Sequence, residues 1–232
     1  MFDFIRKSMI FDAWGAGHHT AITKDNAYHL KTAQDLVVWT FLRKLKGQTI
    51  AEIGGGASRI LPALAKHNDC YNIEKFQGAD GGPSAEIVVP GTKNILAFLG
   101  EKSGGVPEAF FDTIFSVSVV EHVPTVEGLT SFFEEGLASL KPGGLWLHAI
   151  DLYVTDNPSP YWRERFEVYR GWATDKRVTP VGRVFAGPLR FSTNMASNPD
   201  STMFQWSQVS SNHNALRRDA QSVSVFVAAR KS

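Results

Sequence analysis

The sequence has little cysteine, no long apolar run and no excess of one charge. Cys70 is the only cysteine among 232 residues, which excludes a fold built on internal disulfides and a cysteine-rich zinc module. Lys and Arg together number 24 and Asp and Glu 23, a formal net charge of +1. A balance this close to neutrality gives no support for binding nucleic acid or an anionic membrane surface.

The apolar residues are spread along the chain instead of gathering in one stretch. No window reaches the roughly 20 apolar residues of a membrane-spanning helix, and no apolar run near residue 1 marks a secretory signal. Hydrophobic residues still make up 43% of the chain and charged residues 20%, which is enough for a sizeable core. We therefore expect a folded, cytoplasmic protein.

Predicted strands and helices alternate along the middle of the chain. Short apolar runs predict strands, and apolar residues three and four apart predict helices. Strands are expected at residues 49–53, 70–74, 85–89, 111–117, 145–150 and 223–229, and helices at 26–45, from 58 onward, at 95–99, 129–140 and 161–172. Gly47 is expected to end the first helix, and residues 141–144 to form a turn. Such alternation predicts an α/β fold with a parallel sheet and helices on both faces.

A glycine-rich turn joins the first of these strands to the next helix. Gly54, Gly55 and Gly56 allow a sharp turn and let a ligand approach without a Cβ in the way, and a following helix would offer free N–H groups to it. Glu74 ends the next strand, 22 residues after Glu52. A carboxylate there is placed to hold the two hydroxyls of a ribose. The pattern predicts a nucleoside cofactor.

The charges around the turn distinguish between cofactors. Arg59 stands three residues after Gly56, where the nicotinamide dinucleotide pattern has its third glycine. Glu52 points at the mouth of the turn, where a carboxylate would repel a pyrophosphate and attract an ammonium group. S-adenosylmethionine carries an ammonium and a sulfonium and no phosphate, so the charges favour it.

Three segments resemble the class I S-adenosylmethionine-dependent methyltransferases, in the order of that family: residues 52–58, 111–123 and 140–144. The resemblance implies a Rossmann-like, doubly wound sheet of seven strands, mostly parallel, with an antiparallel last strand and helices on both faces. It implies that the glycine turn contacts the methionine part, and that Glu74 contacts the ribose. The cofactor-binding residues expected on this basis are Glu52, Ile53, Gly54, Gly55, Gly56, Arg59, Glu74, Lys75, Ser116, Val117, Ser118 and Glu121.

The chain departs from the family pattern at two positions. Ser58 stands where the family often has a third glycine. No acid follows the predicted strand at 85–89, where the family usually has an Asp for the adenine amino group. The adenine contact is therefore assigned to backbone groups near Pro90 or Gly91.

Candidate catalytic residues follow the predicted strands at 111–117 and 145–150. His122, His148 and Asp151 are the predicted catalytic residues, because an acceptor hydroxyl needs a base and histidine is the usual one near neutral pH. His148 and Asp151 are three residues apart on a strand, so they should face opposite sides. Glu121, His122 and Asp151 have no diagnostic metal-ligand spacing, and no metal is predicted.

The predicted helix at 161–172 combines aromatic and basic residues. Its side chains suit a sugar ring or an anionic substrate, although ordinary packing against a sheet is the alternative interpretation. The residues concerned are Tyr161, Trp162, Arg163, Arg165, Phe166, Tyr169 and Trp172.

These observations predict a single methyltransferase domain over residues 1–232. It comprises an N-terminal lid and helix (1–46), a cofactor-binding core (47–151), a substrate-side insertion (152–200) and C-terminal strands (201–232). The expected reaction is O-methylation of a small molecule or a sugar or glycan hydroxyl with S-adenosylmethionine. Two alternatives stay open: an NAD(P)-dependent oxidoreductase, and a catalytically silent cofactor-binding protein that serves as a partner subunit.

Overall fold

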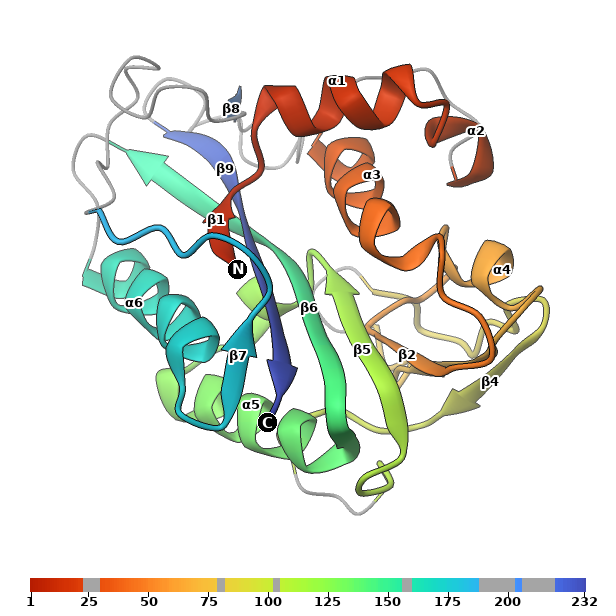
Figure 1. The fold of residues 1–232 in the computed structure, drawn as a ribbon. Coiled ribbons are helices and arrows are strands. Elements are labelled where there is room, and N and C mark those ends of the chain that lie inside the picture. Colours follow the sequence, from red (N-terminus) through yellow and green to blue (C-terminus); the bar gives the residue numbers. More distant parts are fainter. Residues whose placement is uncertain (23–29, 79–81, 102–104, 156–159, 188–202, 206–219) are drawn as a thin grey trace.

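The computed structural model describes residues 1–22, 30–78, 82–101, 105–155, 160–187, 203–205 and 220–232 (Figure 1). The helices in these ranges are α1 (Lys7–Gly15), α2 (His19–Ile22), α3 (Leu30–Leu42), α4 (Leu61–Leu64), α5 (Val126–Ser139) and α6 (Pro160–Thr174), with a 3₁₀ turn at Val120–His122. The strands are β1 (Phe2–Phe4), β2 (Thr49–Ile53), β3 (Asp69–Ile73), β4 (Thr92–Ile95), β5 (Phe111–Val117), β6 (Leu140–Thr155), β7 (Val178–Pro180), β8 (Met203–Gln205) and β9 (Ala220–Lys231). None of the helices in the described part of the chain is both long and apolar enough to span a bilayer.

All of these strands belong to one sheet, in the order β1-β9-β6-β5-β2-β3-β4, with β7 and β8 also paired to β9. Neighbours from β4 to β6 are parallel, and β9 is antiparallel to β6. The prediction of a doubly wound, mostly parallel sheet with an antiparallel last strand is confirmed. The path from β1 to β4 has seven strands, the number that the resemblance implies, although β1 was not among the predicted strands, and β7 and β8 bring the sheet to nine.

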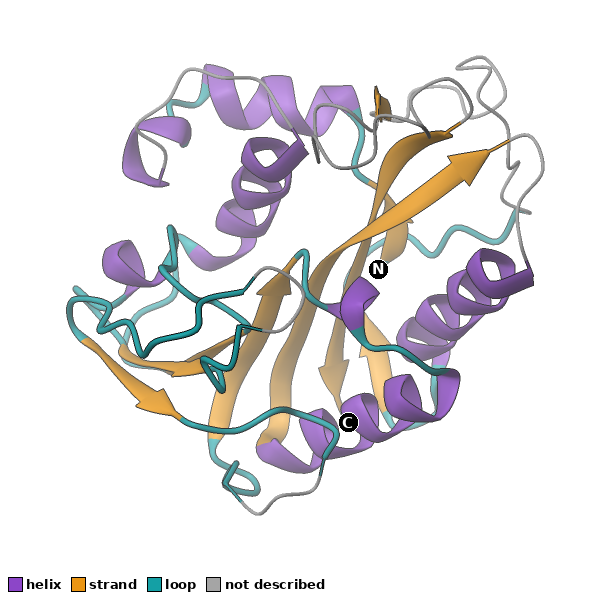
Figure 2. Cartoon of the chain, turned by 180° about the vertical axis from the view of Figure 1, so that it is seen from behind, coloured by secondary structure: helices purple, strands orange, loops and turns teal. Residues whose placement is uncertain are grey.

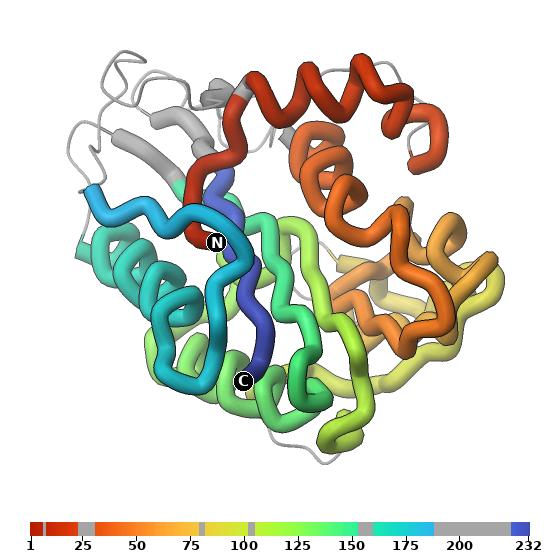
Figure 3. Tube along the Cα trace, in the orientation of Figure 1, coloured from red at the N-terminus to blue at the C-terminus, as the bar shows by residue number. Residues whose placement is uncertain are grey.

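Three short strands share the outer edge of β9. β6 occupies the other edge of β9 from Ala220 to Arg230, so β7, β1 and β8 lie end to end opposite it, at 229–231, 225–227 and 221–223. Figure 3 shows the N-terminal segment running beside the C-terminal strand. The segment predicted as a lid, residues 1–46, therefore also contributes a strand to the sheet.

The alternation of apolar residues along the strands produces two cores, one on each face. Ala51 and Ile53 of β2 face one core with α5 and α6, and Ile50 faces the other with α3 and α4. Figures 1 and 2 show these helix pairs on opposite sides of the sheet. Period-two alternation with both sides apolar is what a strand covered on both faces requires.

The third predicted strand was placed too early. Residues 85–89 are a loop, with Val88 78% exposed, and β4 follows at Thr92–Ile95. The helix predicted at 95–99 is wrong as well. Ile95 is still in the ladder with Ile73, and its carbonyl accepts from Glu74 and Ala97. The apolar run at 85–89 misled the prediction because β4 is an edge strand, where polar residues are tolerated.

Two helices are shorter than predicted. α3 ends at Leu42 and not at Gly47, whose positive φ of 65° belongs to the turn before β2. The helix after the glycine turn is only the four residues of α4. The hydroxyl oxygen of Ser58 accepts from the backbone N–H groups of Ile60 and Leu61, at 3.2 and 2.9 Å. So short a helix gives little of the dipole that the prediction assigned to it.

Residues 141–144 lie within β6 and interrupt its pairing with β5. The ladder passes from Phe111 opposite Leu140 to Thr113 opposite Leu145, and Gly143 has a φ of 77°. The predicted turn is therefore a bulge in a continuous strand.

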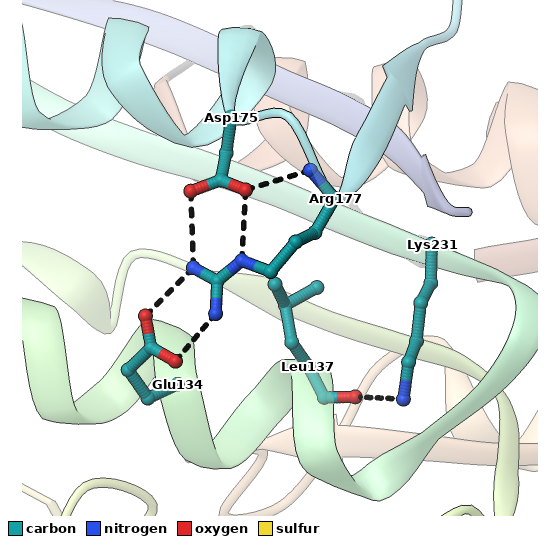
Figure 4. Close-up of polar contacts among 5 residues, drawn as sticks. All are labelled: Glu134, Leu137, Asp175, Arg177 and Lys231. Atoms are coloured by element: carbon teal, nitrogen blue, oxygen red, sulfur yellow. Dashed lines mark hydrogen bonds and ion pairs between the residues drawn. The ribbon is translucent and has the colours of Figure 1, made fainter.

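Arg177 and Lys231 fix α5 at the amino end of the parallel strands (Figure 4). The guanidinium of Arg177 bonds both carboxylate oxygens of Glu134 on α5, at 2.6 and 2.7 Å, and the carboxylate of Asp175 before β7. The ammonium group of Lys231 donates to the carbonyls of Leu137 and Leu140, at 2.6 and 2.8 Å. These carbonyls end α5 and have no partner within the helix.

Candidate functional site

The glycine turn at the carboxyl end of β2 is held by a residue of β3. Gly54 and Gly56 have φ values of 63° and 49°, which favour glycine. The side chain of Asn72 is fully buried; its Oδ1 accepts from Gly55 N at 3.2 Å and its Nδ2 donates to Gly56 O at 3.0 Å. Asn72 is not among the predicted site residues, since nothing in the local pattern of β3 marks this role.

Glu52 lies buried beneath the turn. The hydroxyl of Ser58 donates to its carboxylate, and burial raises the pKa of Glu52 to about 7. A Cβ on Gly55 would lie 3.0 Å from Cδ of Glu52 and 2.8 Å from Oδ1 of Asn72. Only a glycine at 55 lets the backbone close over both side chains.

Glu74 and Lys75 follow β3 at the same edge of the sheet. Oε1 of Glu74 accepts from the backbone N–H of Phe76 at 3.1 Å, and Lys75 forms an ion pair with Glu101. Glu74 is half-buried. Its position at the tip of the second parallel strand is the one the sequence predicts.

The predicted adenine contact is at the wrong end of its strand. Pro90 and Gly91 precede β4, which runs parallel to β3 and ends at Ile95. The carboxyl edge that carries Glu74 is therefore continued by residues 96–98. Leu96 is 61% exposed there.

Arg59 is bound to α3. Its guanidinium pairs with the carboxylate of Asp35, with Nη2 to Oδ1 at 2.9 Å, and that carboxylate is buried. The pair, whose arginine is exposed, joins α3 to the segment after the glycine turn. Arg59 is a predicted cofactor-binding residue, and in the structure its charge is already paired.

His148 is a core residue rather than a catalytic base. It is fully buried against the rings of Trp146, Phe132 and Trp172, and its Nδ1 lies 2.7 Å from the hydroxyl of Ser116. Burial lowers the pKa of His148 to about 3. The predicted catalytic role of His148 does not fit these surroundings, because a general base must reach the acceptor.

Asp151 faces the other side of the sheet from His148, as the strand period predicts. Its Oδ1 accepts from Nε2 of Gln34 at 2.5 Å, and its Oδ2 lies 3.5 Å from Nζ of Lys31. The hydroxyl of Ser118 lies 2.6 Å from Oε1 of Gln34. Ser118 has a φ of 52°, which turns the chain out of β5. Three elements, α3, β5 and β6, meet around the Asp151 carboxylate.

The turn after β5 adjoins both the glycine turn and Asp151. A Cβ on Gly54 would lie 2.6 Å from Cγ2 of Val119, so these two loops are in contact. Glu121 is buried on the following 3₁₀ turn, and burial, with the nearby charge of Asp151, raises its pKa well above the usual value. His122 is exposed on the same turn.

Known structures share this arrangement of strands. The geranyl diphosphate C-methyltransferase of Streptomyces coelicolor A3(2), solved with Mg²⁺, geranyl diphosphate and S-adenosyl-L-homocysteine, has 14% identity and a TM-score of 0.52, over 92% of this chain and 88% of that one. A geranyl diphosphate methyltransferase in complex with S-adenosylmethionine has 12% identity and a TM-score of 0.51, over 92% and 95%. The YcgJ protein of Bacillus subtilis has 11% identity and a TM-score of 0.51, over 84% and 96%.

The chain has the fold of the class I methyltransferases. At these identities the likeness concerns the fold alone. No protein-family model matches the sequence, and no curated protein matches it by sequence.

In the methyltransferase fold described here, the predicted residues fall into two groups at the carboxyl edge of the sheet. Glu52, the three glycines and Glu74 lie at the ends of β2 and β3, Ser118 and Glu121 follow β5, and Asp151 lies in β6 just beyond the end of β5. Ligands bind at this edge in doubly wound sheets. Among the described residues, no three His, Cys, Asp or Glu side chains gather as a set of metal ligands.

Proposed function

We propose that this chain is an S-adenosylmethionine-dependent methyltransferase that methylates a hydroxyl of a small molecule or a sugar. The observation that carries the proposal is the glycine turn at the end of β2, held by Asn72 over the buried Glu52 and packed against Val119. In a sheet with the methyltransferase order, this turn adjoins both Glu74 and the loop after β5. A nucleoside with a positively charged amino-acid tail matches this arrangement of the glycine turn, Glu74 and the loop after β5.

Each part of the cofactor has a candidate partner at this edge. Backbone groups of the glycine turn and the Glu52 carboxylate would take the ammonium-bearing methionine part. The half-buried carboxylate of Glu74 would take the ribose hydroxyls. The exposed side chain of Leu96, next in line after β4, would take one face of the adenine. NAD is disfavoured because Arg59 stands where the nicotinamide dinucleotide pattern has its third glycine.

The transfer itself is a displacement at the sulfonium methyl carbon. The acceptor oxygen forms the new C–O bond as the S–C bond breaks, S-adenosylhomocysteine leaves, and the hydroxyl proton passes to a base. His122, exposed on the turn after β5, and Asp151, held by Gln34 and Lys31, are the proposed base and its assistant. His122 follows β5, and Asp151 is buried on the neighbouring strand β6, two residues beyond the partner of the last residue of β5.

Calorimetric titration with S-adenosylhomocysteine and with NAD tests the cofactor. We expect micromolar binding of S-adenosylhomocysteine, about −8 kcal/mol, and no binding of NAD. Glu74→Ala should weaken it by about 1–3 kcal/mol, because a charged hydrogen-bond partner is lost. Glu86→Ala, which removes an equal charge from an exposed loop residue, is the matched control.

The results separate the alternatives. Binding of NAD in place of S-adenosylhomocysteine would favour an oxidoreductase. Equal affinity in the Glu74 and Glu86 variants would show that Glu74 has no ribose role. Tight binding of the cofactor without transfer of labelled methyl to any member of a metabolite panel would favour the catalytically silent subunit.

A further inference from the structure

Arg165 is a buried cation on the face of α6 that turns toward the end of β5. Its side chain has no solvent exposure. One of its nitrogens, Nη2, donates to the carbonyls of Glu121 and Val123 in the turn after β5. The aromatic ring of Tyr161 covers the guanidinium, with its centroid 4.4 Å from Cζ. Arg165 therefore links α6 to the loop that carries Glu121 and His122.

The remaining hydrogen-bonding capacity of Arg165 is unused. Nε and Nη1 are buried and have no partner, and no carboxylate forms an ion pair with the guanidinium, among the residues that the structure describes. A buried charge without a counter-charge destabilises a fold. Buried polar groups are otherwise nearly always satisfied, so these two nitrogens point to a ligand that is itself negatively charged.

A second unpartnered donor lies one helical turn away. The hydroxyl of Tyr169 is buried without a partner in the described part of the chain, and residues four apart on a helix lie on the same face. Burial raises the pKa of that hydroxyl, the nearby charge of Arg165 lowers it, and the carboxylates of Glu121 and Asp151 raise it. Arg165 and Tyr169 thus present three unused donor atoms on one face of α6, beside Glu121.

The site is close to the surface despite its burial. Tyr161, whose ring covers the guanidinium, is itself 41% exposed. The guanidinium of Arg165 therefore contacts a side chain that reaches the surface. Arg165 holds the carbonyls of the turn after β5, and the start of that turn contacts the glycine turn. The site therefore borders the acceptor side of the proposed cofactor position.

We propose that Arg165 and Tyr169 bind an oxyanion of the methyl acceptor, a carboxylate or a phosphate group, and so fix the acceptor beside the turn after β5. This inference rests on the proposed function for the identity of the ligand as acceptor. The binding of an anion by these two side chains does not depend on it.

The test uses the full chain saturated with S-adenosylhomocysteine, titrated with sodium pyrophosphate, with sodium succinate, and with sodium chloride at matched ionic strength. A proton–nitrogen NMR spectrum follows the Nε–H signal of Arg165, assigned by its loss in Arg165→Lys, and calorimetry measures affinity. We expect a saturable shift with at least one oxyanion in the millimolar range and none with chloride. A stronger response to pyrophosphate identifies a phosphorylated acceptor, and a stronger response to succinate a carboxylate one.

Variants on the same helix provide the controls. Arg165→Lys should lower the oxyanion affinity at least tenfold and Tyr169→Phe about threefold, whereas Arg163→Lys, on the exposed side of α6, should leave it unchanged. Tyr169→Phe removes a single hydroxyl, so it keeps the test open if Arg165→Lys does not fold. The proposal is overturned if no oxyanion shifts the Arg165 signal, or if the Tyr169 and Arg163 variants bind alike. Failure of S-adenosylhomocysteine to bind, with oxyanion binding intact, would count against the proposed function alone.

Discussion

The buried carboxyl group of Glu52 makes stability depend on pH in a direction unusual for an acid. Its pKa is about 7 in the folded chain against an ordinary value of 4.5, so between these values the folded state holds more protons than the unfolded state. The free energy of unfolding must then fall as pH rises from about 4.5 to 7 and level off above. The shift corresponds to about 3 kcal/mol at most.

Glu52→Gln isolates this effect, because glutamine keeps the shape and does not titrate. We expect the free energy of unfolding of the variant, relative to that of the parent, to increase by about 2–3 kcal/mol from pH 5 to pH 8. Urea unfolding at each pH measures this difference. Other titrating groups cancel in the comparison. A constant difference across this range would mean that Glu52 ionises as easily in the folded chain as in the unfolded one.

Asn72 shows which site residues a sequence reveals and which it does not. The glycines were predicted because three of them in a strand-to-helix turn mark a backbone that a ligand can approach. Glu74 was predicted because it stands at the usual distance of the ribose-binding acid from such a turn. Asn72 and Gln34 were missed because their partners are distant in sequence, at Gly55 and Asp151. A polar residue in a strand carries no local sign of what it will bond across the fold.

Removal of the Asn72 side chain should loosen the glycine turn. In Asn72→Ala the N–H of Gly55 and the carbonyl of Gly56 lose their partner, which should cost about 1–3 kcal/mol of unfolding free energy and reduce affinity for S-adenosylhomocysteine. Asn94→Ala is the control, since Asn94 also donates to a carbonyl, that of Ile87, but lies half-exposed at the sheet edge. Equal losses in both variants would show that the turn does not depend on Asn72.

At the scale of elements, the central strands were predictable and the edges were not. β2, β5 and the middle of β6 are buried on both faces, so their apolar runs mark them. β4 is an edge strand with exposed Lys93, and the more apolar segment 85–89 lies outside the sheet. The three-residue strands β1, β7 and β8 exist because β9 offers a free edge, which no local pattern records.

The packing of α5 against β6 can be tested at a glycine where the helix lies close to the strand. Gly136 lies inside α5, and a Cβ there would come within 2.2 Å of Cζ3 of Trp146, which is fully buried. Alanine normally stabilises a helix interior by about 1 kcal/mol relative to glycine. We expect Gly136→Ala instead to lower the free energy of unfolding by about 1–3 kcal/mol, because the indole must move in a close-packed core.

Gly171 of α6 is the matched control, since nothing lies within 4 Å of a Cβ built there. Gly171→Ala should raise the free energy of unfolding by about 0.5–1 kcal/mol, as measured by urea or thermal unfolding. A stabilised Gly136→Ala variant would contradict the contact with Trp146.

At the scale of the whole molecule, the N-terminal segment ties the two halves of the site together. β1 pairs with the last strand, β9, while α3 supplies Asp35 to Arg59 near the glycine turn and Lys31 with Gln34 to Asp151 in β6. The parallel central strands were predictable along the chain, because the three motifs come in the order of the family. The role of α3 did not, because an amphipathic pattern fixes its buried face and not the partners of its polar residues.

The last prediction concerns the two candidate catalytic groups that this assembly brings to one edge. If the acceptor is a hydroxyl, its proton must leave as the methyl group arrives, and loss of a general base commonly lowers the rate by about 10²–10⁴-fold. His122→Ala and Asp151→Asn should therefore reduce transfer of labelled methyl to the acceptor identified by the metabolite panel, while the affinity for S-adenosylhomocysteine changes only a few-fold. His67 is an exposed histidine at the opposite end of the sheet beside Gly47, and His67→Ala should leave both the transfer rate and the affinity unchanged.

Unaltered rates in the His122 and Asp151 variants would mean that positioning of the acceptor suffices, since the acceptor would then lose its proton to solvent. A loss of cofactor binding confined to His122→Ala would instead assign that side chain to the wall of the cofactor site.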